Sequence, residues 1–123
     1  GRFHDQDAAR RLSAAIDRTL AALADPVRRR AVELLGERPR SAGELAGELG
    51  LAPPAMSRHL RALKEGGLVE DGHPAFDARV RIYSLKDGAT DGLRQWLAET
   101  EALWTHQLAA FKRHVEGDGG TGR

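Results

Sequence analysis

The feature that most constrains the fold is a pair of short helical segments joined by a very tight turn, within residues 41–65. The first segment, SAGELAGELG, opens with Ser41 and Glu44 at the spacing of a capping box and closes at Gly50. The second begins at Pro53, where a proline costs little because N–H groups in a first turn have no helical partner. Its apolar positions recur at helical spacing and are Met56, Leu60 and Leu63. The two segments predict a helix-turn-helix.

The second of these helices carries a polar, basic face opposite its apolar stripe. At about 100° per residue, this face presents Ser57, Arg58 and Arg61. His59 falls at the margin of the stripe. An arginine can pair with guanine through two hydrogen bonds or hold a phosphate, and a serine can bond either group. These side chains could simply be a solvated surface, but in a helix-turn-helix we favour contact with DNA.

Positive charge is concentrated in the middle of the chain, although the net charge is only +1. Residues 28–64 contain eight Arg and Lys residues against four Glu residues. Residues 87–118 contain three basic residues against six acidic ones. A basic middle and an acidic end indicate an anionic partner for the middle of the chain. Charge alone does not distinguish this from a solvated surface of mixed charge.

The remaining segments predict a mainly α fold with a small β component. Apolar residues at helical spacing predict one helix over residues 7–24 and a second that starts at Pro26. Residues 68–85 predict a two-stranded β-hairpin, because LVED and RVRIYSL flank a link that contains Gly and Pro. A wide apolar stripe predicts a long last helix over residues 90–116. About five helices and a hairpin make a winged helix.

This winged helix is expected to be a single DNA-binding and dimerisation domain over residues 1–115. The Gly-rich residues 116–123 are expected to be a disordered tail. No long apolar run is present, so we expect neither a signal peptide nor a membrane span, and a cytoplasmic location.

Composition and motifs argue against several function classes. The chain of 123 residues has no Cys, which removes disulfides, thiolate metal sites and Cys nucleophiles. The residue types of a catalytic triad are present in Ser57, His59 and Asp71. We do not expect them to act as one, because Ser57 lies inside a predicted helix with no nucleophile elbow. We therefore expect no enzyme activity and no cofactor.

Three stretches together carry a family resemblance: ALADPVRRRAVELL, RSAGELAGELGLAPPAMSRHLRALKEGGLVE and RIYSL. They resemble the ArsR/SmtB family of bacterial winged helix-turn-helix repressors over roughly Leu20 to Leu85. The resemblance implies a homodimer built from the first and last helices, with the second helix of each helix-turn-helix in the major groove and the hairpin as a wing. It also implies repression of promoters until an unknown small-molecule effector binds.

The chain departs from the metal sensors of that family. It lacks the Cys pair that such sensors carry, and His106 and His114 are eight residues apart, which does not match their usual last-helix pattern. We expect no metal site.

The predicted contacts with double-stranded DNA lie on the second helix of the helix-turn-helix, at the start of the first one, and on the hairpin. They are Arg40, Ser41, Pro54, Ser57, Arg58, His59, Arg61, Arg79 and Arg81. Arg40 and Ser41 precede a capped helix start, which favours phosphate. Two alternatives stay open. His59 could hydrogen-bond to the backbone instead of DNA, and Arg79 and Arg81 could be charges on an edge strand that prevent aggregation. A winged helix that binds a protein instead of DNA is the alternative for the whole domain.

The predicted dimer interface lies on the first and last helices, which carry more apolar surface than so small a domain can cover. Its residues are Leu12, Ile16, Leu97, Trp104, Leu108 and Phe111. The alternative is that the two helices only pack on each other within one chain.

Overall fold

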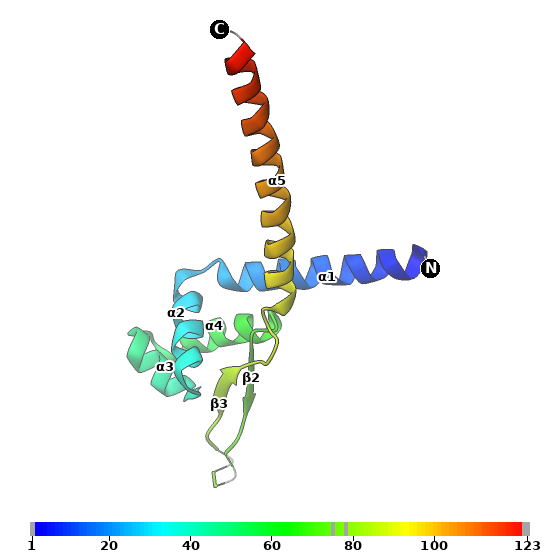
Figure 1. Ribbon diagram of the computed structural model, residues 1–123. Coiled ribbons are helices and arrows are strands. Elements are labelled where there is room, and N and C mark those ends of the chain that lie inside the picture. The colour runs from blue at the N-terminus through cyan, green and yellow to red at the C-terminus, as the bar shows by residue number, and fades with distance from the viewer. Residues whose placement is uncertain (1, 75, 78, 122–123) are drawn as a thin grey trace. The chain divides into compact units, whose positions relative to one another are not determined.

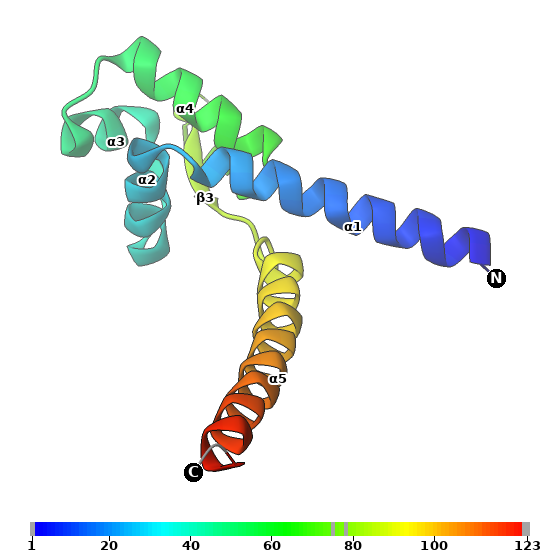
Figure 2. The same cartoon turned by 90° about the horizontal axis from the view of Figure 1, so that it is seen from above.

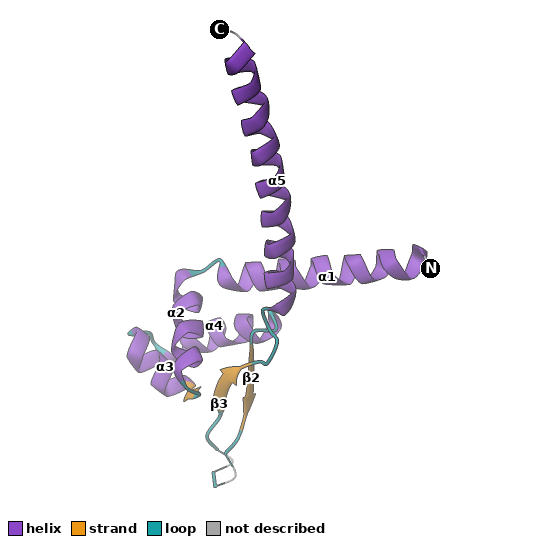
Figure 3. Ribbon diagram, viewed as in Figure 1, coloured by secondary structure: helices purple, strands orange, loops and turns teal. Residues whose placement is uncertain are grey.

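Five helices and three short strands follow one another along the part of the chain that the structure describes (Figures 1 and 3). The computed structural model describes the backbone of residues 2–74, 76–77 and 79–121, with side chains from residue 5 to residue 117 of these. The helices are α1 (Arg2–Leu23), α2 (Pro26–Glu37), α3 (Ala42–Leu49), α4 (Pro53–Glu65) and α5 (Asp91–Thr121). The strands are β1 (Arg40–Ser41), β2 (Val69–Gly72) and β3 (Ile82–Leu85). The predicted mainly α winged helix-turn-helix is confirmed.

The helix-turn-helix consists of α3 and α4, and its ends are fixed by the predicted local signals. The Ser41 hydroxyl accepts from the Glu44 N–H at 3.1 Å, and the Ser41 N–H donates to the Glu44 carboxylate at 3.2 Å. Gly50 ends α3 with φ +66°, a left-handed conformation that suits glycine. Only two residues separate Gly50 from Pro53, where α4 starts. The turn is short because the stop and start signals are nearly adjacent.

A small antiparallel sheet joins the helix-turn-helix to the wing. Its strand order is β1-β3-β2, with Ser41 opposite Ile82 and Glu70 opposite Ser84. The sheet thus has three strands where the hairpin alone predicted two. The extra strand, β1, is only two residues long and carries no periodic signal. Strand β3 also starts at Ile82, so Arg79 and Arg81 belong to the wing loop and not to a strand.

The core forms where α2, α3 and α4 pack against one another and against the start of β2. Its largest fully buried side chains are Leu45, Met56, Leu60, Leu63 and Leu68. Helix α1 crosses the C-terminal end of α4 very closely (Figure 2). A Cβ atom on Gly66 would lie 2.6 Å from the Ala22 Cβ, so only glycine fits this crossing. The inner stripe of α4 is therefore held by the core, which leaves its opposite stripe to solvent.

The chain divides into two units, residues 1–92 and 93–123, and nearly all of α5 forms the second. This helix continues to Thr121, into residues 116–123, for which the sequence predicts a disordered tail; residues 122–123 lie outside the described part. No helix in the described chain is long and apolar enough to cross a bilayer.

Candidate nucleic-acid interface

The outer face of α4 is the centre of the candidate interface. Pro54, Ser57, Arg58 and Arg61 are all exposed, on the side opposite the buried stripe. Within the described residues, neither Arg58 nor Arg61 has a carboxylate within ion-pair distance. Their guanidinium groups are thus available to phosphates or to base edges. The structure brings together the four α4 residues that the sequence pattern placed on one face.

His59 occupies the edge of that face and is half-buried. It lies near Asp25, the N-cap of α2, whose carboxylate accepts from the N–H groups of Val27 and Arg28 at 2.7 and 3.2 Å. Burial raises the pKa of Asp25, but these backbone hydrogen bonds and the nearby positive charge of His59 and Arg28 outweigh it, and the pKa is lowered. His59 therefore borders both the outer face of α4 and the turn between α1 and α2.

The wing loop between β2 and β3 is held by polar contacts within itself. The Arg79 N–H donates to the Asp77 carboxylate at 2.9 Å, and the His73 ring nitrogen Nδ1 lies 2.9 Å from the Val80 carbonyl oxygen. The Arg79 side chain is almost fully exposed, and its Nε lies 3.4 Å from the Asp77 carboxylate. Phe76, at the end of the wing, is exposed as well. Arg79 is the wing cation best placed to reach a partner.

Arg81 is engaged differently, by a carboxylate that it shares with α4. Asp71 on β2 has its side chain only 9% exposed, and its two oxygens receive two cations. Lys64 Nζ lies 2.6 Å from Oδ1, and Arg81 Nε lies 3.1 Å from Oδ2. The hydrogen bond from Lys64 is the main cause of the lowered pKa of Asp71. Sequence reasoning missed Lys64 and Asp71 as partners, although their charges are seven residues apart at a helix–strand junction.

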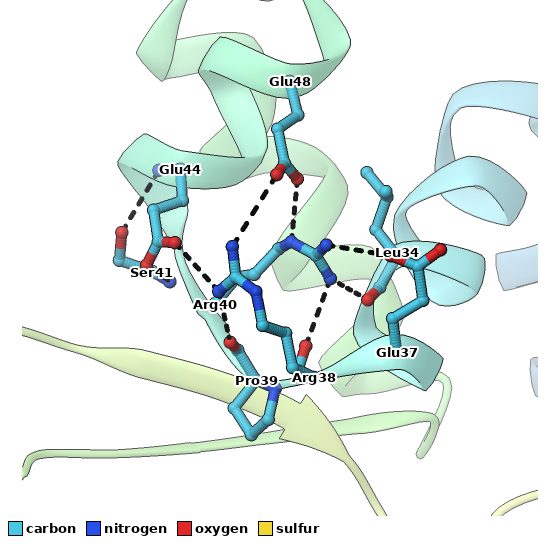
Figure 4. A network of polar contacts seen from close by, with 8 residues as sticks. All are labelled: Leu34, Glu37, Arg38, Pro39, Arg40, Ser41, Glu44 and Glu48. Atoms are coloured by element: carbon cyan, nitrogen blue, oxygen red, sulfur yellow. Dashed lines mark hydrogen bonds and ion pairs between the residues drawn. The ribbon is translucent and has the colours of Figure 1, made fainter.

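Arg40, which the sequence pattern places among the DNA contacts, has a side chain that is only 5% exposed. Figure 4 shows the polar groups that surround it. Its Nη1 donates to the carbonyl oxygens of Leu34 and Arg38, and its Nη2 and Nε lie 3.1 and 2.8 Å from the carboxylates of Glu37 and Glu48. Arg40 therefore joins the C-terminal end of α2 to α3. Its guanidinium is turned inward because the pairing of β1 with β3 places it under these groups.

Ser41 and Arg38 complete the same cluster at the start of α3. The Ser41 hydroxyl is already an acceptor in the capping box, and Arg38 pairs with Glu44 and Glu48 at 3.0 and 3.8 Å (Figure 4). The backbone N–H of Ser41, followed by Arg38, is the main cause of the lowered pKa of Glu44. The predicted phosphate site at the start of α3 is thus occupied by the protein's own carboxylate.

The residues predicted for the dimer interface are exposed with one exception. On α5, four of these residues are exposed in the single chain: Leu97, Trp104, Leu108 and Phe111, with Trp104 at 68%. Leu12 on α1 is exposed as well. The exception is Ile16, which is only 8% exposed within the chain itself. Ile16 therefore has little surface left to offer a second copy.

No metal centre is evident in the part of the chain that the structure describes. No group of three or more His, Asp or Glu side chains there lies close enough to hold an ion. What the described site offers is exposed arginines on a helix and a wing, which is chemistry suited to binding an anionic polymer.

The sequence and the structure of this chain were compared with those of known proteins. A family model described as a helix-turn-helix domain matches residues 23–71. The chain is 38% identical over 103 residues to the HTH-type transcriptional regulator Rv2034 of Mycobacterium tuberculosis. The aligned residues cover 84% of this chain and 91% of that protein. Among solved structures, the ArsR-like transcriptional regulator from Rhodococcus sp. RHA1 has a TM-score of 0.71 at 31% identity, covering 82% of this chain and 92% of that one. A second, an ArsR family transcriptional regulator, has a TM-score of 0.67 at 28% identity, covering 76% and 93%.

Proposed function

Because the chain belongs to the ArsR family of winged helix-turn-helix DNA-binding transcriptional regulators, we propose that it acts as a repressor that binds an operator of two inverted half-sites as a homodimer. The family is one of transcription regulators and not of enzymes. The observation that carries the proposal is the outer face of α4, where Ser57, Arg58 and Arg61 are exposed beside a fully buried inner stripe. A rigidly anchored helix with such a face can place side chains against base edges at a fixed depth.

In this proposal α4 enters the major groove with its N-terminal half. Pro53 and Pro54 set the direction of the helix, and Pro54 and Ala55 offer apolar contact to thymine methyl groups. Arg58 and Arg61 read guanine or hold phosphate, with Ser57 beside them. Arg79 in the wing contacts phosphate or the minor groove of the neighbouring turn, and His59 contacts DNA from the edge of the face.

The homodimer is proposed to form through α1 and α5. The exposed apolar side chains on α5 are too many for a lone helix in water, and a two-fold axis would bury them against their own copies. Two α4 helices related by that axis demand half-sites about 34–36 Å apart, one turn of the double helix. We further propose that a small-molecule effector controls DNA affinity, as the family resemblance implies, and that the protein works in the cytoplasm with the DNA it regulates.

Selection of bound duplexes from a random pool tests the proposal directly. The expected result is an inverted repeat with the stated spacing, bound by the wild-type protein at nanomolar to sub-micromolar concentration. Replacing Arg58 or Arg61 by alanine is expected to cost about 1–3 kcal/mol on the selected operator and to relax one or two positions. Arg30→Ala is the matched control, because Arg30 is an exposed arginine on α2 that pairs with Glu33 at 2.9 Å.

Two outcomes would contradict the proposal. If no sequence is enriched, or if both arginine variants bind the selected operator as tightly as wild type while staying folded, α4 does not read DNA. A partner protein would then be the better candidate for the basic face.

A further inference from the structure

The carboxylate of Asp71 bridges the two elements that are proposed to face DNA. Lys64 comes from the last turn of α4 and Arg81 from the wing loop, and each pairs with a different oxygen of Asp71, at 2.6 and 3.1 Å. The carboxylate is 9% exposed, whereas Lys64 and Arg81 are 56% and 54% exposed. Asp71 is thus a nearly buried anion that pairs with two half-exposed cations from different elements.

Lys64 belongs to the proposed DNA-facing side of α4. It follows Ser57 by seven residues and Arg61 by three, the spacings at which side chains on a helix are neighbours. A lysine there would be expected to reach phosphate. The structure instead directs its ammonium group at Asp71, at a distance typical of a strong charge-assisted hydrogen bond.

The cations around α4 therefore fall into two groups. Arg58 and Arg61 face solvent without an ion pair among the residues described, whereas Lys64 and Arg81 share one carboxylate. Each phosphate that a protein neutralises adds affinity for any sequence, since the released counterions come from all DNA alike. Cations that are held by an internal carboxylate add less of this sequence-independent affinity.

We propose that Asp71 is a specificity-determining residue that withholds Lys64 and Arg81 from phosphates, so that binding depends more on the base-facing side chains of α4. This inference rests on the proposed DNA-binding function. The lowered pKa of Asp71 keeps its carboxylate ionised at neutral pH, so that it can pair with both cations.

The test is Asp71→Asn, measured on a duplex of unrelated sequence over a range of salt concentrations. The amide keeps the shape of the side chain and removes its charge. If both freed cations reach phosphate, the slope of log K against log salt steepens by about 1.8 per protomer, and by about 0.9 if one does. The loss of affinity between about 50 and 200 mM salt then grows about 4- to 12-fold per protomer. Affinity for the unrelated duplex rises at low salt, and the preference for the selected operator falls.

Two further variants separate this from a general effect of charge. Glu70→Gln removes a carboxylate from the adjacent position on β2, which is exposed and has no ion pair with any described residue. We expect this variant to leave the salt slope nearly unchanged. Adding Lys64→Gln to Asp71→Asn is expected to reverse about half of the steepening. A slope for Asp71→Asn that equals or lies below that of wild type overturns the inference, as does an equal steepening by Glu70→Gln.

The remaining outcomes are also decisive. Thermal unfolding followed by circular dichroism establishes whether Asp71→Asn is folded. If it is not, Lys64→Gln alone is used: a held Lys64 leaves the wild-type slope within about 0.3, and a flattening by about 0.9 overturns the inference. A wild-type protein that binds no duplex at all would refute the proposed function instead, so the two failures are distinguishable.

Discussion

Replacing Arg40 by alanine tests whether this buried arginine is a structural residue or a DNA contact. The side chain makes two hydrogen bonds to backbone carbonyls and two ion pairs, and it links α2, β1 and α3. Alanine would leave the carbonyl oxygens of Leu34 and Arg38 without this donor in a partly buried place. The expected result is a large loss of stability with little effect on the face of α4.

The magnitude follows from the contacts. Breaking a buried ion pair by removing one partner costs about 3–5 kcal/mol, and a hydrogen bond from a charged donor contributes about 1.5–3 kcal/mol. The carboxylates of Glu37 and Glu48 are 69% and 38% exposed, so water can solvate them once Arg40 is gone. We therefore expect Arg40→Ala to lower the free energy of unfolding by about 2–4 kcal/mol, which lowers Tm by roughly 10–25 °C for a domain of this size.

The assay is equilibrium unfolding in urea followed by circular dichroism, with Arg38→Ala as the matched control. Arg38 is a nearby arginine but exposed, and its pairs with Glu44 and Glu48 are expected to contribute less than about 1 kcal/mol. DNA affinity is measured at a temperature where both variants are folded. The reasoning is refuted if Arg40→Ala loses less than about 0.5 kcal/mol of stability and yet binds the operator much more weakly.

Three further predictions concern the cap, the dimer and pH. Ser41→Ala removes the N-cap of α3 and should cost about 1 kcal/mol in urea unfolding; an unchanged midpoint would contradict the capping box. Leu108→Glu places a charge in the exposed apolar stripe of α5, and light scattering should report monomer where wild type is a dimer; a dimeric variant would exclude that stripe. The lowered pKa of Asp71 means that its stabilisation is complete above its ordinary pKa, about 4, and is lost as pH falls through the lower folded value. Asp71→Asn should therefore flatten the acid side of the stability profile, and an unchanged acid transition would contradict this.

The helix-turn-helix could be predicted from the sequence because its signals are local. Ser41 and Glu44 are three residues apart, and the stop at Gly50 and the start at Pro53 need no information from elsewhere in the chain. The inner stripe of α4 follows from helical spacing alone. The same spacing placed Arg58 and Arg61 on the outer face, where the structure has them.

The role of Arg40 could not be predicted in the same way, because it depends on contacts between distant segments. Nothing in residues 38–41 indicates that β1 pairs with β3, more than forty residues further along. That pairing, together with Glu48 from α3, turns Arg40 inward. The ion pair of Asp71 with Arg81 could not be predicted for a related reason, since the two residues come close only when the wing folds back along β2.

This distinction between held and available cations gives the salt dependence of operator binding a definite expected value. A count of charge along the sequence would assign phosphate contacts to Arg40, Lys64 and Arg81 as well as to Arg58, Arg61 and Arg79. Six contacts per protomer in a homodimer correspond to a slope of about −11 in log K against log salt, whereas the last three alone correspond to about −5. Arg40, Lys64 and Arg81 are engaged by carboxylates at 2.6–3.1 Å, whereas the exposed Arg79 has a looser pair with Asp77 at 3.4 Å. We therefore expect the smaller value. Titration of the selected operator at several salt concentrations measures it, and a wild-type slope near −11 would show that the ion pairs open when DNA binds.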